Sequence, residues 1–472
     1  MKRFFYAIWE HIEYLFILVL FVGVFYLSFT SNSYAGPDYH TSPEYANRLF
    51  DETRVHRIDV QIDEKKLASL RENPKDKTKY RTTVTIDGEK LENVSFSTRG
   101  NGSLSAVAEL DYSDRYSYTL NFHRYNEAGS YYGLDRLSLN SLAADPSYLK
   151  DYLAYRIVAA IGLDYPLTSF TELYINGEPN GLYLATEGID NTFLKRTNSS
   201  PDAALFHPIP YSFNHDKINQ NSKTSSVKEV DSEMEWMGYG GSDLVYVGDA
   251  IEDYNAIFDN ATTKYSRADE VFVIDAIESL SEFSLKSPED YWDIDSVIKF
   301  FVAASLIPNS DSYLGGTSQN YYLKLSNGKL SLMPWDYDCA FHLEKESYDD
   351  NYSSNRNNAI GWPIDSLLIG PSKDERPLWR LLADNPDYLN RYHAILQTVL
   401  DEYIFSGEYL QSLESASRLI RGYVYSDPTK LTTNEGFEEE VEYLHHFIPA
   451  RADAIQRQLW GIDSSTKPNK KE

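Results

Sequence analysis

The chain has 472 residues, of which 42% are hydrophobic, so it can bury one large core or the cores of two or three domains. Its 44 Lys and Arg against 71 Asp and Glu give a net charge of -27, which argues against nucleic acid or anionic lipid as a partner. The single cysteine, Cys339, excludes an intrachain disulfide and a thiolate zinc site.

The N-terminal segment is predicted to enter a membrane. Lys2 and Arg3 precede an uncharged stretch at 14–37. This stretch is typical of a membrane anchor, but the small residues near its end are also typical of a signal-peptide cleavage site. Residues 1–35 are therefore interpreted either as an anchor or as a cleaved signal peptide. The two basic residues favour a cytoplasmic N-terminus, which places the body of the chain outside the cytoplasm. A linker is expected over 36–50.

Residues 51–190 are predicted to be rich in antiparallel strands. Alternation of apolar and polar residues predicts strands at 55–62, 82–87, 93–99, 116–122 and 136–140. A helix then begins near Asp145, which can cap it, and stops at Gly162. Residues 170–187 read as a hairpin around a Gly, Pro and Asn turn.

Residues 191–462 are predicted to be mainly helical. Apolar residues recur at three- and four-residue spacing over 266–282, 293–307, 386–404, 408–422 and 436–460. One hairpin interrupts the helices, with Asn327 and Gly328 supplying its tight turn. Residues 208–232 read as an exposed loop, and the polar tail at 463–472 as disordered.

Four polar residues flank this hairpin. Asp311 and Asn320 precede its first strand, while Asp336 and Asp338 follow its second. Because a hairpin brings its entry and exit together, these side chains are expected to converge. Protein kinases use a similar order, with an Asp that orients the acceptor hydroxyl and oxygen ligands that hold Mg²⁺ on the phosphates. The alternative is a set of loop carboxylates that cap helices or face solvent.

Four ordered stretches resemble the CotH kinase family. They are STRGNGS (97–103), LSLNSLAADPSYLKDYLAYRIVAAIG (137–162), LYINGEPNGLYLATEGID (173–190) and MPWDYD (333–338). The resemblance spans residues 50–460 and implies an α+β, bilobed, atypical kinase-like fold, with a strand-rich N-lobe at 51–190 and a helical C-lobe at 191–462. It also implies an enzyme that transfers the γ-phosphoryl group of ATP, with Mg²⁺, to Ser or Thr of a cell-envelope or secreted protein.

The resemblance assigns roles to individual residues. Asp311 falls where the acidic residue of the catalytic loop is expected, and Asp336 where a metal ligand is expected. Asn320 and Asp338 would be further magnesium ligands.

The resemblance also implies a nucleotide site in the first half of the chain. Arg99, Gly100 and Gly102 belong to a loop whose backbone N–H groups could approach phosphates, although a GxG is also a common turn. Arg115 would add positive charge. Glu187 would meet the nucleotide or pair with a cation, and its alternative is a surface position.

One departure from the family pattern affects this site. Many relatives carry basic residues along the strand that reads RYSYTLNF at 115–122 here, whereas Thr119 and Asn121 are uncharged. Either Arg99 and Arg115 supply the charge instead, or nucleotide binding is weakened or lost.

Two other functions therefore stay open. The first is a non-catalytic, kinase-like protein with a structural or adhesive role at the cell surface. The second is a binding protein in which Asp336 and Asp338 hold Ca²⁺ and exposed aromatic side chains hold a glycan. In either case Trp335 reads more readily as a core anchor than as a residue that stacks on adenine.

Overall fold

The computed structural model describes residues 42–210, 240–342 and 358–466. Residues from Glu44 onward form one unit. Within the described part of the chain, no helix is both long enough and apolar enough to span a membrane. The predicted anchor or signal at 1–35 lies outside the described residues, as does most of the polar loop predicted at 208–232.

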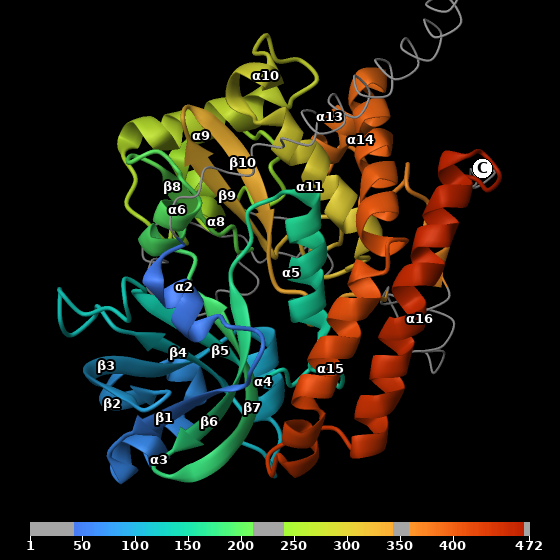
Figure 1. Cartoon of the computed structure of the whole chain (residues 1–472). Helices are drawn as coiled ribbons and strands as arrows, with labels where there is room; N and C mark the ends of the chain where they lie inside the picture. The colour runs from blue at the N-terminus through green and yellow to red at the C-terminus, as the bar shows by residue number, and fades with distance from the viewer. Residues whose placement is uncertain (1–41, 211–239, 343–357, 467–472) are drawn as a thin grey trace, which may run out of the picture. The chain divides into compact units, whose positions relative to one another are not determined.

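Seven strands of the first half close into a barrel in the order β1-β2-β3-β4-β5-β7-β6 (Figure 1). The strands are β1 (His56–Gln61), β2 (Tyr80–Ile86), β3 (Glu89–Arg99), β4 (Ser117–Asn121), β5 (Arg136–Asn140), β6 (Thr168–Ile175) and β7 (Glu178–Glu187). All neighbouring pairs are antiparallel except β1 and β6, whose parallel pairing closes the barrel. The strand-rich first half is confirmed, and its sheet is closed rather than open.

The barrel interior is filled by side chains from alternate strand positions. Ile58 and Val60 of β1 and Leu173 of β6 belong to this core and are fully buried. Short helices pack around the barrel, namely α2 (Glu44–Leu49), α3 (Glu64–Glu72), η1 (Pro74–Asp76) and α4 (Gly102–Ala108). Along a strand, residues that alternate with the core point outward, and on β3, β4 and β5 many of these outward residues are polar.

The second half is mainly helical, as predicted. After α6 (Asn191–Arg196), its helices are η3 (Ile251–Tyr254), α8 (Asn255–Phe258), α9 (Arg267–Ser279), α10 (Pro288–Tyr291), α11 (Ile294–Leu306), α13 (Pro377–Ala383), α14 (Pro386–Val399), the π-helical turn η4 (Leu400–Ile404), α15 (Glu408–Ser426) and α16 (Asn434–Leu459). Their apolar faces form a second core, distinct from the barrel core. Figure 1 shows α15 and α16 side by side, and the two helices contact each other.

Helix α5 (Lys150–Ile161) links the barrel to the helices. It follows β5 in the chain and packs against α11, α14 and α15. Gly162, in the left-handed conformation (φ 78°), ends the helix as predicted. The helix begins five residues after Asp145, yet the Asp145 carboxylate still accepts the Lys150 N–H at 2.8 Å. Asp145 therefore caps the first turn from outside the helix.

The predicted hairpin belongs to a small sheet. Strands β8 (Ala204–Phe206), β9 (Tyr321–Ser326) and β10 (Lys329–Pro334) lie in the order β10-β9-β8. Asn327 (φ 52°) and Gly328 (φ 67°) form the two-residue turn between β9 and β10. Two successive positive φ angles are what the tightest hairpin turns require. Because β10 ends at Pro334, the Asp336 and Asp338 carboxylates follow directly after the strand.

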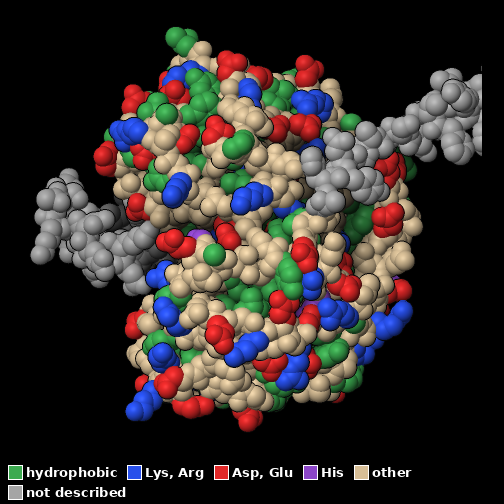
Figure 2. Space-filling model, turned by 60° about the vertical axis from the view of Figure 1, so that its left-hand side comes forward, with side chains coloured by type: hydrophobic (Ala, Val, Ile, Leu, Met, Phe, Trp, Pro, Cys, Tyr) green, Lys and Arg blue, Asp and Glu red, His purple; other side chains and the backbone are tan. Residues whose placement is uncertain are grey.

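Charge is not concentrated in one patch on the face of the molecule that Figure 2 shows. On the face that Figure 2 shows, acidic and basic side chains are interspersed. The excess of acidic residues therefore acts mainly as a general negative potential.

Candidate functional site

The loop before β9 and the segment after β10 are hydrogen-bonded to each other. The Trp335 N–H donates to the Asn320 carbonyl at 3.0 Å. The Asn309 side-chain amide, in the loop after α11, donates to the Asp336 carbonyl at 3.3 Å. The structure thus brings together the two segments that were predicted to converge at the hairpin.

Asp311 is held by three side-chain donors from its own loop. Its Oδ1 accepts from the Thr317 hydroxyl at 2.9 Å and from the Gln319 amide at 2.6 Å, and its Oδ2 accepts from the Asn320 amide at 3.0 Å. A carboxylate has about four lone-pair sites, so it can still accept a further hydrogen bond. The three donors fix the orientation of Asp311.

Asp336 and Asp338 form a half-buried pair of like charges. Asp336 has a left-handed backbone (φ 57°), and its N–H lies 3.4 Å from the Tyr155 hydroxyl. Burial first, and then the charge of Asp338, raise the pKa of Asp336 well above its usual range, against the opposing effect of Arg99. Burial and the charge of Asp151 raise the pKa of Asp338 to about 6. Together these carboxylates carry more negative charge than the nearby cations balance.

A third carboxylate, Asp151 of α5, is hydrogen-bonded to the backbone of this segment. Its Oδ1 accepts the Tyr337 N–H at 2.7 Å, and its Oδ2 accepts from the Asn140 amide at 3.2 Å. The Asn140 Oδ1 in turn accepts a hydrogen bond from Arg99. Burial and the charge of Asp336 raise the pKa of Asp151 to about 7. A continuous chain of hydrogen bonds therefore runs from the end of β3 to the backbone between Asp336 and Asp338.

The carboxylates of Asp151, Asp336 and Asp338 line one small pocket between the barrel and α5, whereas Asp311 does not line it. Its lining residues are Arg99, Gly100, Ser103, Ser117, Asn140, Ser141, Leu142, Ala143, Asp151, Asp336 and Asp338. The cavity is about 40 Å³, which holds an ion with a few water molecules. Four of the residues predicted from the sequence, Arg99, Gly100, Asp336 and Asp338, thus line the same cavity.

The donor set fits a divalent cation that also binds phosphate. Among the described residues, no three His, Cys, Asp or Glu side chains are arranged as a complete metal site. Mg²⁺ does not need such a site, because it is usually held by one or two carboxylates, water and substrate phosphates. The raised pKa of Asp336 marks a carboxylate pair that a cation would relieve. Asn320 is turned toward Asp311, to which its amide nitrogen donates, so in this geometry it positions Asp311.

Aromatic side chains form a wall beside the carboxylates. The Arg99 guanidinium lies 5.8 Å from the centre of the Trp335 ring, and Trp335 makes an edge contact with Tyr322 of β9 at 5.6 Å. Tyr322 stacks on His207 at 4.3 Å. Trp335 is 5% exposed and packs in the helical core, in agreement with its interpretation as a core anchor.

Comparison with known proteins identifies the family. Residues 96–455 match the family described as CotH kinase protein. The chain belongs to this family. Residues of the chain are also 21% identical over 346 positions to the inner spore coat protein H of Bacillus subtilis (strain 168), covering 73% of this chain and 83% of that protein. The family match includes every residue of the pocket described above.

Two residues that the CotH resemblance placed at a nucleotide site are engaged elsewhere. The Arg115 side chain is fully buried and pairs with Asp427 at 2.7 Å, while its other nitrogens donate to backbone carbonyls. Glu187 is also fully buried, where it pairs with Arg196 at 2.6 Å and accepts from the Tyr45 hydroxyl. Neither side chain lines the pocket. Both form buried ion pairs. For Glu187 this is the pairing with a cation that was one of its expected roles, and the residue is buried, not at the surface.

The loop glycines differ from each other. Gly100 lines the pocket in a conformation (φ 101°) that favours glycine. Gly102 begins the short helix α4 and does not line the pocket.

Sequence reasoning missed Asp151 and Asn140. The signal for Asp151 is a carboxylate in the first turn of a largely apolar helix, where burial would require a partner. Asn140, at the end of β5, carries no comparable signal, because an Asn at the end of a strand is common.

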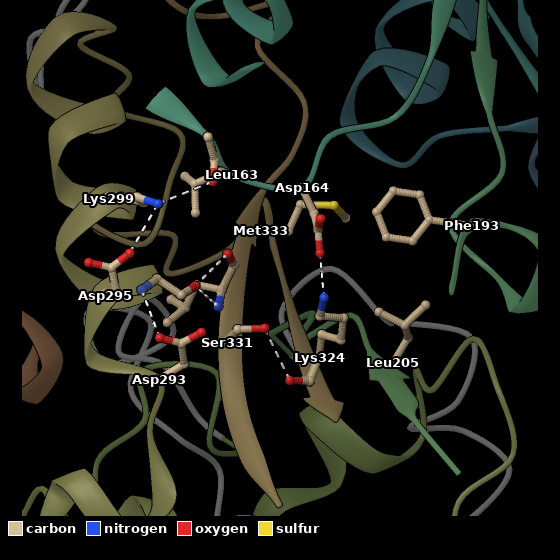
Figure 3. Close-up of a pocket in the computed structure, with 13 residues that line it drawn as sticks. Leu163, Asp164, Phe193, Leu205, Asp293, Asp295, Lys299, Lys324, Ser331 and Met333 are labelled. Atoms are coloured by element: carbon tan, nitrogen blue, oxygen red, sulfur yellow. Dashed lines mark hydrogen bonds and ion pairs between the residues drawn. The ribbon is translucent and has the colours of Figure 1, made fainter. Parts of the chain in front are cut away.

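A second, larger pocket lies on the helical side of the chain (Figure 3). It has a volume of about 230 Å³ between α11, β8 and the β9–β10 hairpin. Its lysines are already paired, Lys299 with Asp295 at 3.0 Å and Lys324 with Asp164, and Asp293 accepts the Ser296 N–H at the start of α11. None of the residues predicted to carry chemistry lines it, so the smaller pocket is the candidate site of this CotH family member.

Proposed function

We propose that this CotH family member is an atypical, extracytoplasmic protein kinase. It would transfer the γ-phosphoryl group of ATP, with Mg²⁺, to a Ser or Thr hydroxyl of a cell-envelope or secreted protein. The observation that carries the proposal is that the loop of Asp311, whose carboxylate three donors hold, is hydrogen-bonded through Asn309 to the segment of the half-buried pair Asp336 and Asp338, beside Arg99.

The proposed reaction uses each group in a distinct way. The acceptor hydroxyl oxygen bonds to the γ-phosphorus, the bond from that phosphorus to the β–γ bridging oxygen breaks, and ADP leaves. Asp311 accepts a hydrogen bond from the hydroxyl, orients it and receives its proton. Asp336 and Asp338 would hold Mg²⁺, which neutralises charge on the phosphates when bound. Arg99 adds a fixed positive charge at the same end of the site.

The proposed location rests on the N-terminal sequence and on the relative. Lys2 and Arg3 before an apolar stretch favour export of the body of the chain. The similarity to an inner spore coat protein is consistent with a role at a cell or spore surface. The chain would reach that location as an anchored or a secreted protein.

Replacement of Asp336 tests the enzymatic proposal. We expect Asp336→Asn to reduce Mg²⁺-dependent transfer of labelled γ-phosphate, to the protein itself or to a Ser/Thr-rich acceptor, by at least about 100-fold, because the metal would lose its main charged ligand. The melting temperature should not fall, since the change relieves repulsion with Asp338. Asp290→Asn, on the exposed part of α10, is the matched control. Equal transfer by both variants would refute the proposal.

A non-catalytic surface protein is the second candidate. Its support is that Arg115, one of the two arginines expected to replace the basic residues absent at 119 and 121, is consumed by the buried pair with Asp427. This candidate predicts no transfer by the wild-type protein under any metal or nucleotide condition. Calorimetric titration with Mg-ATP, and separately with Ca²⁺ alone, distinguishes a nucleotide-binding protein without turnover from a Ca²⁺-binding protein.

A further inference from the structure

The outward surface of three neighbouring barrel strands is polar at every position near the pocket. We call it the polar sheet face, and it consists of Ser95, Ser97, Arg99, Ser117, Thr119, Asn121, Arg136, Ser138 and Asn140. Register places these residues in rows across β3, β4 and β5. Their neighbours along each strand, such as Tyr118 and Leu139, point into the barrel core. Directly paired residues lie on the same side of a sheet, so the nine side chains share one face. Ser95, Ser97 and Ser138 are buried on this face, and the other six residues are half-buried.

Two arginines stand at opposite corners of the polar sheet face. Arg99 is at the end of β3, where it lines the pocket beside Asp336. Arg136 begins β5 and is paired directly with Asn121 of β4. The seven residues between the two arginines are hydroxyls and amides, which can donate hydrogen bonds and add no negative charge.

The Arg136 side chain is held by contacts to Ile189 and Asp190 and is still partly exposed. Its Nη2 donates to the Ile189 carbonyl at 2.9 Å, and its Nε lies 3.5 Å from the Asp190 carboxylate. The side chain is 30% exposed. Within the described residues, Nη1 makes no hydrogen bond, so part of the guanidinium remains available to a ligand.

Arg99 and Arg136 both influence the pKa values of two aromatic side chains, Tyr322 and His207. Tyr322 and His207 stack on each other. Burial first, and then Arg99 and Arg136, lower the pKa of His207, whereas burial raises the pKa of Tyr322 against the opposing effect of both arginines. Asp336 also acts on Tyr322. Arg99 and Asp336 line the pocket, and Arg136 lies on the same face of the sheet as Arg99, two strands away.

We infer that Arg136 is a second polyphosphate-binding arginine, which works with Arg99 across the polar sheet face. This inference rests on the proposed function to the extent that the polyphosphate belongs to a nucleotide. Arginine suits this role because its planar guanidinium binds phosphate oxygens through two N–H groups. The positive charge that is absent at 119 and 121 is then supplied by the neighbouring strand.

Binding measurements with Arg136→Gln test the inference. By calorimetry, we expect the affinity for Mg-ATP and for inorganic tripolyphosphate with Mg²⁺ to fall by about tenfold or more, because a charged hydrogen bond to phosphate is lost. The affinity for adenosine should be unchanged. Arg57→Gln removes the same charge from β1, which borders β2 and β6 instead, and should leave all three affinities unchanged.

A rescue experiment separates binding from a structural role. Because Asn121 is paired with Arg136, a lysine introduced at 121 places a cation beside the vacated position. Asn121→Lys in the Arg136→Gln protein should restore most of the affinity for tripolyphosphate. A purely structural role, in which Arg136 only holds Ile189 and Asp190, predicts no rescue and a lower melting temperature.

The outcomes also distinguish this inference from the proposed function. A wild-type protein that binds tripolyphosphate through Arg136 but transfers no phosphate would refute the kinase proposal and support the inference. Equal loss of adenosine and ATP affinity in Arg136→Gln would overturn it, since the arginine would then contact the nucleoside. Absence of any polyphosphate binding by the wild-type protein would overturn it as well.

Discussion

His207 is a histidine kept neutral by its surroundings. Its ring stacks on Tyr322 at 4.3 Å, with the two ring planes 11° apart. Burial first, and then the charges of Arg99 and Arg136, lower its pKa from 6.5 to about 3. A protonated His207 would add a third positive charge to those of Arg99 and Arg136. The aromatic wall of the site therefore depends on the neutral form of this residue.

This depressed pKa predicts acid sensitivity. As pH falls below about 6.5, the unfolded chain gains a proton at His207 that the folded protein does not accept, so folding stability is lost as pH falls toward 3. His207→Phe keeps an aromatic ring but removes the titration. Urea denaturation gives the difference in free energy of unfolding between this variant and wild type. We expect this difference to favour the variant by up to about 2 kcal/mol more at pH 5 than at pH 7.5. A pH-independent difference would contradict this account.

At the scale of elements, strand β7 packs closely against the buried ion pair of Arg115 and Asp427. Gly181 (φ 97°) lies against Asp427 and Arg115 so closely that a Cβ atom would overlap the Asp427 carboxylate and the Arg115 guanidinium. The Leu182 N–H donates to Asp427 at 2.9 Å. The strand thus approaches the ion pair through a position that only glycine can occupy.

Two glycine substitutions separate the effect of conformation from that of contact. Gly177, in the β6–β7 turn, has a similar φ of 87°, but a Cβ atom at this position would meet no other atom within 4 Å. We expect Gly177→Ala to cost about 1 kcal/mol, from left-handed backbone strain alone. Gly181→Ala should cost about 3 to 5 kcal/mol, because it also displaces a buried ion pair. Denaturant unfolding measures both, and similar costs would show that the ion pair tolerates the displacement.

The sequence predicted those turns and helix ends that are determined by residues adjacent in the chain. The β9–β10 hairpin follows from Asn327 and Gly328, and the end of α5 follows from Gly162. Closure of the barrel was not predicted, because β1 pairs in parallel with β6, more than a hundred residues later in the chain. Helices as short as α2 and α4 span too few turns to show a periodic pattern.

In the candidate site too, contacts between neighbouring segments could be predicted, whereas contacts between residues far apart in the chain could not. The convergence of Asp311 with Asp336 could be predicted because one hairpin joins their segments. The contact between Asp151 and the Tyr337 N–H joins residues 186 positions apart, which no local pattern reveals. Arg115 was expected at the nucleotide site for its charge alone, but its partner Asp427 lies 312 positions away.

At the scale of the whole molecule, the Arg115–Asp427 pair joins the two cores. Arg115 precedes β4 of the barrel, and Asp427 follows α15 of the helical part. The Arg115 guanidinium also lies over the rings of Tyr148 and Tyr183, at 5.4 and 5.1 Å from their centres. A pair this deeply buried couples the folding of the barrel to that of the helices, because removing one partner leaves an unbalanced charge inside the protein.

A double-mutant cycle tests this coupling. We expect Arg115→Met and Asp427→Leu each to cost about 3 to 5 kcal/mol, and the double variant to cost clearly less than their sum, because no charge is then left unpaired. Residues 51–190 contain no tryptophan, so tryptophan fluorescence follows the helical part, while hydrogen exchange follows β4 and β7. In each single variant, exchange in these strands should rise at lower denaturant than the fluorescence change. Additive costs with coincident transitions would instead mean that other contacts couple the barrel to the helices.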